Sequence, residues 1–198
     1  LSDPKIVRSV VRSLATLAYA DRRRAKFAQQ QLVAALRILQ RGDISLAGMT
    51  GSWAGAMGHT QFIPTTYEAY AVDYDGDGRR NLIRSVPDML ASTANYLKHL
   101  GWKPRQPWLQ EVRVPANLAW DQADLSTEHP PEQWTGWGVT RTDGKPITGP
   151  NSSMLLPMGR HGPAFLVYPN FKNVYLTWNH SLTYSITAAY LATRLEGA

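Results

Sequence analysis

The sequence has 198 residues, with 21 Lys and Arg against 15 Asp and Glu, seven tryptophans and no cysteine. This length suits one domain with an insertion or two small lobes, and a content of 43% hydrophobic and 18% charged residues excludes a disordered chain. The composition excludes a disulfide scaffold, a thiolate metal site and a cysteine nucleophile, while the net charge of +6 suits an anionic partner such as nucleic acid, a phospholipid surface or an acidic cell-wall polymer.

Helical periodicity is strongest in the first hundred residues and predicts helices over 4–20, 21–40, 64–70 and 85–100. Asp3 and Pro4 fit the start of the first helix, and Gly42 fits the end of the second. Between the second and third helices, residues 48–58 contain four glycines. Glycine permits tight turns and close approach of the backbone to a ligand, so this segment is a candidate functional loop.

The pattern changes after residue 102, where prolines are frequent and helical periodicity fades. Short apolar runs at 108–114, 154–158 and 164–167 predict strands, and a helix is expected again over 181–195. The sequence therefore predicts a mainly α protein of the α+β class. We expect a helical domain over 1–102, a small β-containing insertion over 103–167, and a return to the helical domain over 168–198.

Residues 73–81 match the first half of an EF-hand calcium loop, with oxygen-bearing side chains at alternate positions and a glycine after the third aspartate. The twelfth position holds Arg84 where a bidentate glutamate is expected. The expected ligands are Asp73, Asp75, Asp77, the backbone carbonyl of Arg79, and Asp88. A structural calcium ion is the preferred interpretation, because closely spaced carboxylates repel one another without a cation. The alternative is a solvated turn rich in aspartate.

Several enzyme motifs are absent from the sequence, including HExxH, a Walker phosphate loop and GxGxxG. The five histidines lack metal-ligand spacing, and none of the glutamates has the polar and aromatic neighbours expected of a glycosidase acid. Residue patterns alone therefore do not identify a catalytic group.

A set of longer motifs resembles the lytic murein transglycosylase B family and spans nearly the whole chain, most weakly over 103–167. The most specific is the run Ala-Gly-Ala-Met-Gly-x-x-Gln-Phe-x-Pro within residues 51–67. The others are 14–17 (Leu-Ala-Thr-Leu) with Arg23-Arg24-Ala, 70–82, 92–97 (Ser-Thr-Ala-Asn-Tyr-Leu), 168–171 (Tyr-Pro-Asn-Phe) and 178–181 (Trp-Asn-His-Ser).

The resemblance implies a lysozyme-like helical domain that cleaves the MurNAc–GlcNAc β-1,4 bond of peptidoglycan and leaves 1,6-anhydromuramic acid ends. In this family a single glutamate, which precedes the Leu-Ala-Thr-Leu helix, protonates the glycosidic oxygen. Residues 1–13 contain no glutamate. The resemblance therefore places the catalytic acid upstream of Leu1, and we expect a truncated or cleaved chain that is inactive alone.

The resemblance also assigns substrate-binding residues. Ser52 and Gln61 are expected to face the catalytic glutamate or the substrate N-acetyl group, and Arg23 and Arg24 to meet the peptide stem or the lactyl carboxylate. The full expected set is Ser52, Gln61, Tyr96, Tyr168, Trp178, Arg23 and Arg24. Family members often have tyrosine where Trp178 stands. The tryptophan of this chain keeps an aromatic ring for stacking but lacks the tyrosine hydroxyl.

These expectations define the partners and the location. The reaction requires no cofactor, the partner is the peptidoglycan glycan strand, and the location is the cell envelope or periplasm of a bacterium. Membrane attachment is expected only through a lipid anchor on an upstream segment. A non-catalytic glycan-binding module is the alternative function. A nucleic-acid binder ranks last, because the positive charges are dispersed and no recognised motif is present.

Overall fold

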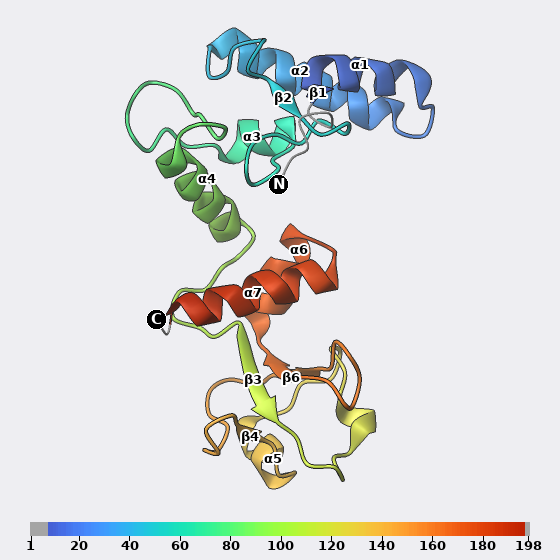
Figure 1. Cartoon of the computed structure of the whole chain (residues 1–198), viewed down its shortest axis with the longest axis vertical. Helices are drawn as coiled ribbons and strands as arrows, with labels where there is room; N and C mark the ends of the chain where they lie inside the picture. The colour runs from blue at the N-terminus through green and yellow to red at the C-terminus, as the bar shows by residue number, and fades with distance from the viewer. Residues whose placement is uncertain (1–7, 197–198) are drawn as a thin grey trace. The chain divides into compact units, whose positions relative to one another are not determined.

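The computed structural model describes residues 8–196, which form two compact units divided after Tyr96 (Figure 1). The described part of the first unit contains two short strands and four helices, the last of which extends to residue 99. These elements are β1 (Arg8–Ser9), α1 (Val10–Ala20), α2 (Ala25–Arg41), β2 (Thr50–Gly51), α3 (Pro64–Tyr70) and α4 (Val86–His99). No helix of the described residues has the length and apolar character needed to cross a membrane.

The first helix begins at Val10 rather than at residue 4. Arg8 and Ser9 are extended because they pair with Gly51 and Thr50 of β2, and the Ser9 side chain caps the helix by accepting the N–H of Arg12 at 3.4 Å. The predicted start at Asp3 and Pro4 lies outside the described residues. Pairing with a distant strand therefore shortens the helix that local periodicity predicts.

The second helix begins at Ala25 rather than at residue 21. The Asp21 side chain accepts the N–H groups of Arg23 and Arg24 at 3.0 and 3.2 Å, and this local turn precedes the helix. Gly42 ends the helix as predicted, with a left-handed φ of 80°.

The core of the first unit joins α1 and α2 to the segments that follow them. α1 lies beside α2 (Figure 1). Leu14 of α1 and Ile38 of α2 are fully buried in one core. The glycine-rich loop, α3 and the segment between α3 and α4 complete this core through Met49, Met57, Phe62, Tyr67 and Leu82. The glycine-rich loop is therefore anchored to the helices by buried apolar side chains.

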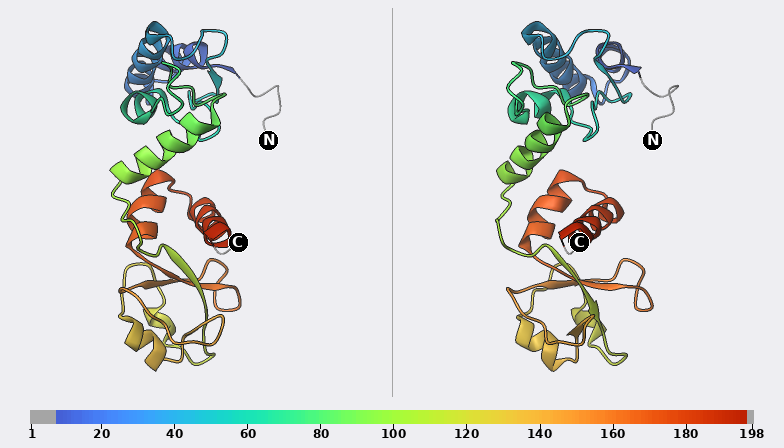
Figure 2. Two further views of the ribbon diagram at one scale, coloured as in Figure 1. Left: turned by 90° about the vertical axis from the view of Figure 1, so that its left-hand side faces the viewer. Right: turned by 60° about the vertical axis from the view of Figure 1, so that its left-hand side comes forward.

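The second unit contains a four-stranded antiparallel sheet in the order β4-β3-β6-β5, followed by helices. Its elements are β3 (Leu109–Arg113), η1 (Trp120–Gln122), α5 (Pro131–Gly136), β4 (Thr140–Arg141), β5 (Ser153–Leu155), β6 (Ala164–Val167), η2 (Phe171–Tyr175), α6 (Leu176–Trp178) and α7 (Leu182–Glu196). β3 and β6 pair with each other, and in Figure 2 they are the yellow-green and orange strands, with α7 in red above them. The predicted strands over 108–114 and 164–167 are present, and only the start of the 154–158 run is in a strand.

The division of the chain differs from the predicted one. The boundary falls after Tyr96, and the segment 168–198 clusters with the strands, because Phe171 and Ile186 share a core with Leu109 and Phe165. A separate cluster around Trp134 fills the other side of the sheet region. Burial of the apolar face of α7 against strand side chains thus makes residues 97–198 one unit.

Candidate functional site

The glycine-rich loop folds back on itself through short backbone hydrogen bonds. The N–H of Ser52 donates to the carbonyl of Ala56 at 2.9 Å, and Met57 and Phe62 exchange bonds of 2.9 and 3.0 Å. A Cβ atom on Gly51 would lie 2.2 Å from the Ala56 carbonyl oxygen. Glycine is therefore required at this position, because any side chain would push the two backbones apart.

Gln61 is held in a strained conformation on this loop. Its φ is 54°, in the left-handed region that a residue other than glycine rarely adopts. The side-chain Nε2 donates to the carbonyl of Gly58 at 2.9 Å, which fixes the amide and leaves its oxygen on an exposed side chain. Strain of this kind at an exposed polar residue points to a functional role.

Ser52 and Tyr96 are half-buried on either side of the loop framework. Ser52 Oγ accepts the N–H of Ala56 at 3.1 Å, so its own hydroxyl hydrogen is available for a further partner. The Tyr96 ring packs against the rings of Phe62 and Tyr70, with centroid distances of 5.5 and 4.8 Å. The pKa of Tyr96 is raised, mainly by burial and to a smaller extent by the nearby Tyr70, and this keeps its hydroxyl protonated.

The backbone and ring contacts connect these predicted residues within the first unit. Gln61 precedes Phe62, whose ring touches Tyr96 and whose backbone pairs with Met57 next to the Ser52 turn. That all three side chains face one substrate remains a prediction.

An arginine and a tryptophan form an exposed pair on the same unit. The Arg24 guanidinium lies 5.1 Å from the centre of the Trp53 ring, and its Nε is 3.8 Å from Asp21. Arg23 is also exposed. Trp53 is 53% exposed, which is unusual for so large an apolar ring. Sequence reasoning missed Trp53, although a tryptophan within a glycine-rich loop is a usable signal.

Trp53 also lines a hollow of about 560 Å³ at the start of α1. Two guanidinium groups, from Arg8 and Arg12, lie along it together with the hydroxyl side chains of Ser9 and Ser13. Sequence reasoning missed these residues too, because the start of α1 was expected to be a plain helix surface. Flat rings, hydroxyls and cations together suit an anionic saccharide.

The two remaining predicted substrate residues belong to the second unit. Tyr168 is 1% exposed, and its hydroxyl donates to Gln110 Oε1 at 2.8 Å. Burial raises the pKa of Tyr168 to about 12. Trp178 is half-buried and packs against Tyr175 and Tyr184 at 6.2 and 5.5 Å. Contact of both residues with substrate remains a prediction.

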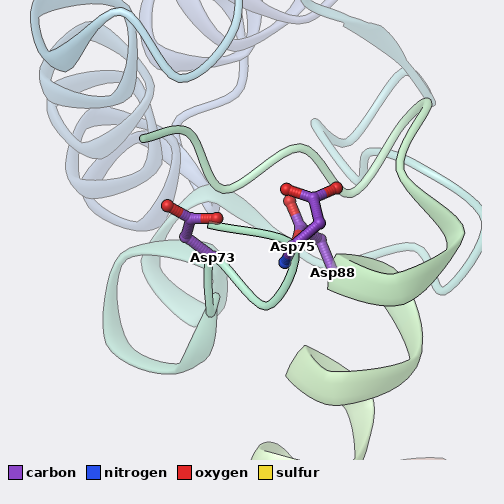
Figure 3. A group of neighbouring side chains, drawn as sticks. All are labelled: Asp73, Asp75 and Asp88. Atoms are coloured by element: carbon purple, nitrogen blue, oxygen red, sulfur yellow. The ribbon is translucent and has the colours of Figure 1, made fainter. Parts of the chain in front are cut away.

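The predicted cation loop follows α3 and ends at α4. The carboxylates of Asp73, Asp75 and Asp88 each place an oxygen within 4.8 Å of the others (Figure 3). Asp88 is fully buried at the start of α4 and accepts the N–H groups of Tyr74 and Asn81 at 2.8 and 2.7 Å. Within residues 8–196, none of the three carboxylates forms an ion pair with Lys, Arg or His, and their donors are backbone N–H groups and the Ser85 hydroxyl.

One predicted side-chain ligand, Asp77, lies outside this group. Asp77 is exposed, and its Oδ1 accepts the N–H of Arg79 at 2.8 Å, which fixes the turn instead. Sequence spacing alone could not separate Asp77 from the converging carboxylates, since the loop conformation decides which oxygens meet.

A buried ion pair ties the far end of the cation loop to the end of α2. Asp43 accepts from Arg80 Nη2 at 2.7 Å and from Arg41 Nε at 3.3 Å, and the Tyr67 hydroxyl donates to the Arg80 carbonyl. Burial alone would raise the pKa of Asp43, but the hydrogen bonds and positive charge of Arg80, aided by Arg41, outweigh it and hold that pKa below its ordinary value.

Comparison with known proteins places these features in a family. The Transglycosylase SLT domain family matches residues 5–193. The membrane-bound lytic murein transglycosylase B of Escherichia coli K12 is 32% identical over 182 residues, which cover 89% of this chain and 48% of that protein. The chain thus spans about half the length of this relative.

Solved structures agree in both fold and sequence. SltB3 from Pseudomonas aeruginosa, in complex with NAG-anhNAM-pentapeptide, is 51% identical with a TM-score of 0.87, over 96% of this chain and 52% of that one. The Escherichia coli lytic transglycosylase Slt35 in complex with calcium is 29% identical with a TM-score of 0.72, over 94% and 61%. The predicted fold class, lysozyme-like and α+β, is confirmed, as is the resemblance noted from the motifs. The chain belongs to the Transglycosylase SLT domain family.

Proposed function

We propose that this chain is the substrate-binding part of a lytic transglycosylase that cleaves the MurNAc–GlcNAc β-1,4 bond of peptidoglycan. The observation that carries the proposal is the strained Gln61 on a closed glycine-rich loop, in a chain matched to the family over residues 5–193. A relative that is 51% identical binds NAG-anhNAM-pentapeptide, which contains the anhydro sugar that such a reaction leaves.

The reaction needs one carboxylic acid and no attacking water. The acid protonates the glycosidic oxygen, the bond to the anomeric carbon breaks, and the muramyl 6-hydroxyl attacks that carbon within the same sugar. The acid, now a carboxylate, takes the proton of that hydroxyl. Internal attack is favoured because the two atoms are already held together in one ring system.

The residues of this chain bind and orient rather than transfer the proton. The free hydroxyl hydrogen of Ser52 and the Gln61 amide oxygen offer hydrogen bonds to the N-acetyl group or to the acid. Trp53 offers a face for stacking, and Arg24 lies beside it as a partner for a carboxylate on the substrate. Residues 1–13 contain no glutamate, and we assign the proton transfer to none of the residues named here.

The experiment that tests this proposal adds a proton donor to the chain. The segment of the Escherichia coli relative that precedes its Leu-Ala-Thr-Leu helix is fused to this chain, and murein sacculi are digested with the fusion and with the 198-residue chain alone. Anhydromuropeptides from the fusion support the proposal. The matched control replaces the donated glutamate with glutamine and releases none. A fusion that folds, binds murein and releases only reducing ends overturns the reaction type.

A non-catalytic glycan-binding module is the second candidate, and the absence of glutamate from residues 1–13 favours it. Binding of muropeptides by a correctly folded fusion that leaves murein intact would favour this module over the enzyme.

We propose further that the cation loop holds a structural calcium ion. Oxygen ligands suit calcium, and three converging carboxylates without a cationic partner among residues 8–196 need a compensating charge. Asp73, Asp75 and Asp88 would hold the ion, with Asp77 and the Arg79 carbonyl as further candidates. Slt35, a relative, has been solved in complex with calcium. The ion would fix the loop between α3 and α4 and take no part in the reaction.

The substrate proposed here also defines a location. Peptidoglycan lies in the bacterial cell envelope, and we propose the periplasm as the compartment in which this chain acts.

A further inference from the structure

A second hollow lies wholly within the unit formed by residues 97–198. Its volume is about 610 Å³, within the range of ordinary ligand pockets. β3 forms one wall through Gln110 and Glu111, and the last turns of α7 form another through Tyr190 and Arg194. Arg141 of β4 closes it. The pocket uses neither the glycine-rich loop nor the cation loop.

Two guanidinium groups line this pocket, from Arg141 and Arg194. Arg141 bonds Asp143 through Nε at 3.3 Å, which leaves its two terminal nitrogens without a hydrogen-bond partner among the described residues. Arg194 forms no ion pair with any residue in 8–196. The planar fork of arginine matches a carboxylate, so two such groups on one hollow favour a ligand that carries one.

The floor of the pocket is an ordered set of neutral hydrogen-bonding groups. Tyr168 is almost fully buried, and its hydroxyl donates to the Gln110 oxygen, which orients the Gln110 amide. The Gln110 nitrogen then remains a donor without a partner in the described part of the chain. Arg141 and Tyr168 both line the pocket.

One acidic group limits the kind of ligand. Glu111 accepts the Tyr190 hydroxyl at 3.2 Å through Oε2, and its other oxygen has no described partner. A simple anion would be repelled by this carboxylate. A peptide end suits the pocket better, because beside its carboxylate it carries amide N–H groups that Glu111 can accept.

We propose that this pocket binds the free C-terminal carboxylate of a peptidoglycan stem peptide. Arg141 and Arg194 hold the carboxylate, Gln110 donates to the peptide carbonyl, and Glu111 accepts a peptide N–H. The inference rests on the proposed function, since it takes its ligand from the same polymer. It adds a peptide site in the second unit, separate from the glycan site proposed on the first.

The experiment measures binding of a free pentapeptide of the stem sequence, and of the same peptide with an amidated C-terminus, to the 198-residue chain by calorimetry. The acid is expected to bind more tightly than the amide. Arg194→Gln and Arg141→Gln should each weaken binding of the acid about threefold and the double variant about tenfold, as expected for partly exposed ion pairs. Binding of the amide should not change in any of these variants.

Arg113→Gln is the matched control, because this substitution removes the same charge. Arg113 is exposed at the end of β3 and lies outside the pocket. Arg194 is exposed on the last turn of α7, so its variant keeps the fold, which a thermal melt verifies. Equal binding of the acid and the amide, or equal loss in the Arg113 variant, overturns the proposal.

A peptide-free glycan strand separates this inference from the proposed function. Pocket variants should bind that strand as the unchanged chain does. If the strand binds but the peptide acid does not, the peptide site is wrong and the glycan function stands. If peptide binds and the strand does not, the proposed function fails.

Discussion

At the scale of single residues, the Asp43 carboxylate shows how charge holds the site framework in place. It is buried and bonded to Arg80 and Arg41, which link the end of the cation loop to the end of α2. Asp43→Asn removes the charge and leaves the Arg80 guanidinium without its partner. We expect the free energy of unfolding at pH 7 to fall by about 2 kcal/mol, measured by urea unfolding. Asp121→Asn, an exposed aspartate, is the control and should change little.

The same residue gives a pH dependence. The pKa of Asp43 lies lower in the folded protein than its ordinary value of 3.8, so its stabilisation is present above that value and is lost as pH falls through the folded pKa. The stability difference between the unchanged chain and Asp43→Asn should therefore be constant from pH 7 to about 5 and narrow below about 4. A difference that stays constant down to pH 2 would show that the ion pair does not contribute.

Substitutions of Gln61 distinguish a role in ligand binding from a role in stability. Gln61→Ala and Gln61→Gly both remove the amide, and glycine also relieves the left-handed strain. Both variants should weaken muropeptide binding about fivefold, the loss of one hydrogen bond, while neither lowers the free energy of unfolding by more than about 1 kcal/mol. Calorimetry and urea unfolding check the two parts, with exposed Gln40→Ala as the control. Unchanged binding would remove Gln61 from the site.

Trp53 is the aromatic side chain expected to carry stacking. Because it is 53% exposed, Trp53→Ala should leave the melting temperature nearly unchanged. We expect it to weaken binding of a peptide-free glycan about tenfold. Tyr19→Ala is the matched control, since Tyr19 is 94% exposed and does not line the hollow that contains Trp53. Equal effects of the two variants would argue against a stacking surface.

At the scale of elements, local signals predicted the helices well and their ends less well. The α3 helix has the predicted bounds because Pro64 fits its first turn, and α2 ends at Gly42 as expected. The start of α1 was wrong because pairing of Arg8 with Gly51 is a non-local contact that periodicity does not report. Short elements such as α5 and β4 were missed, since six or two residues give no period to detect.

The candidate site was predictable to a similar extent. Ser52 and Gln61 came from a motif with family specificity, and the structure adds the left-handed backbone of Gln61 and the hydrogen bond from Ala56 to Ser52. Their contact with substrate remains a prediction. Arg8 and Arg12 were missed, because their meeting with Trp53 depends on the position of α1 against the loop. The cation loop was predicted by spacing, but spacing could not show that Asp77 lies outside the group formed by Asp73, Asp75 and Asp88.

The cation loop is the element whose ligand is most directly testable. Calcium at a hundred times its dissociation constant should raise the free energy of unfolding by about 2.7 kcal/mol. Asp88→Asn should abolish this shift, and Asp143→Asn, an exposed aspartate of the second unit, should not. Thermal melts with calcium, magnesium and chelator provide the measurement. A calcium shift that persists in the Asp88 variant would place the ion elsewhere.

At the scale of the whole molecule, the chain joins a helical unit that carries the glycine-rich and cation loops to a sheet-containing unit that carries the peptide pocket. Helical periodicity and short apolar runs predicted both a helical part and a β-containing part. It could not predict that residues 168–198 pack with the strands, because the apolar faces of η2 and α7 suit either unit and only tertiary packing chooses. A dispersed net positive charge is consistent with an anionic polymer as ligand for both units.

The central claim is that the bond is broken by internal attack and not by water. The fusion that supplies the acid is incubated with murein in water enriched in oxygen-18, and the masses of the released muropeptides are measured by mass spectrometry. We predict products that lack one molecule of water and carry no heavy oxygen. Reducing muropeptides that contain one heavy oxygen atom per cleavage would contradict the account.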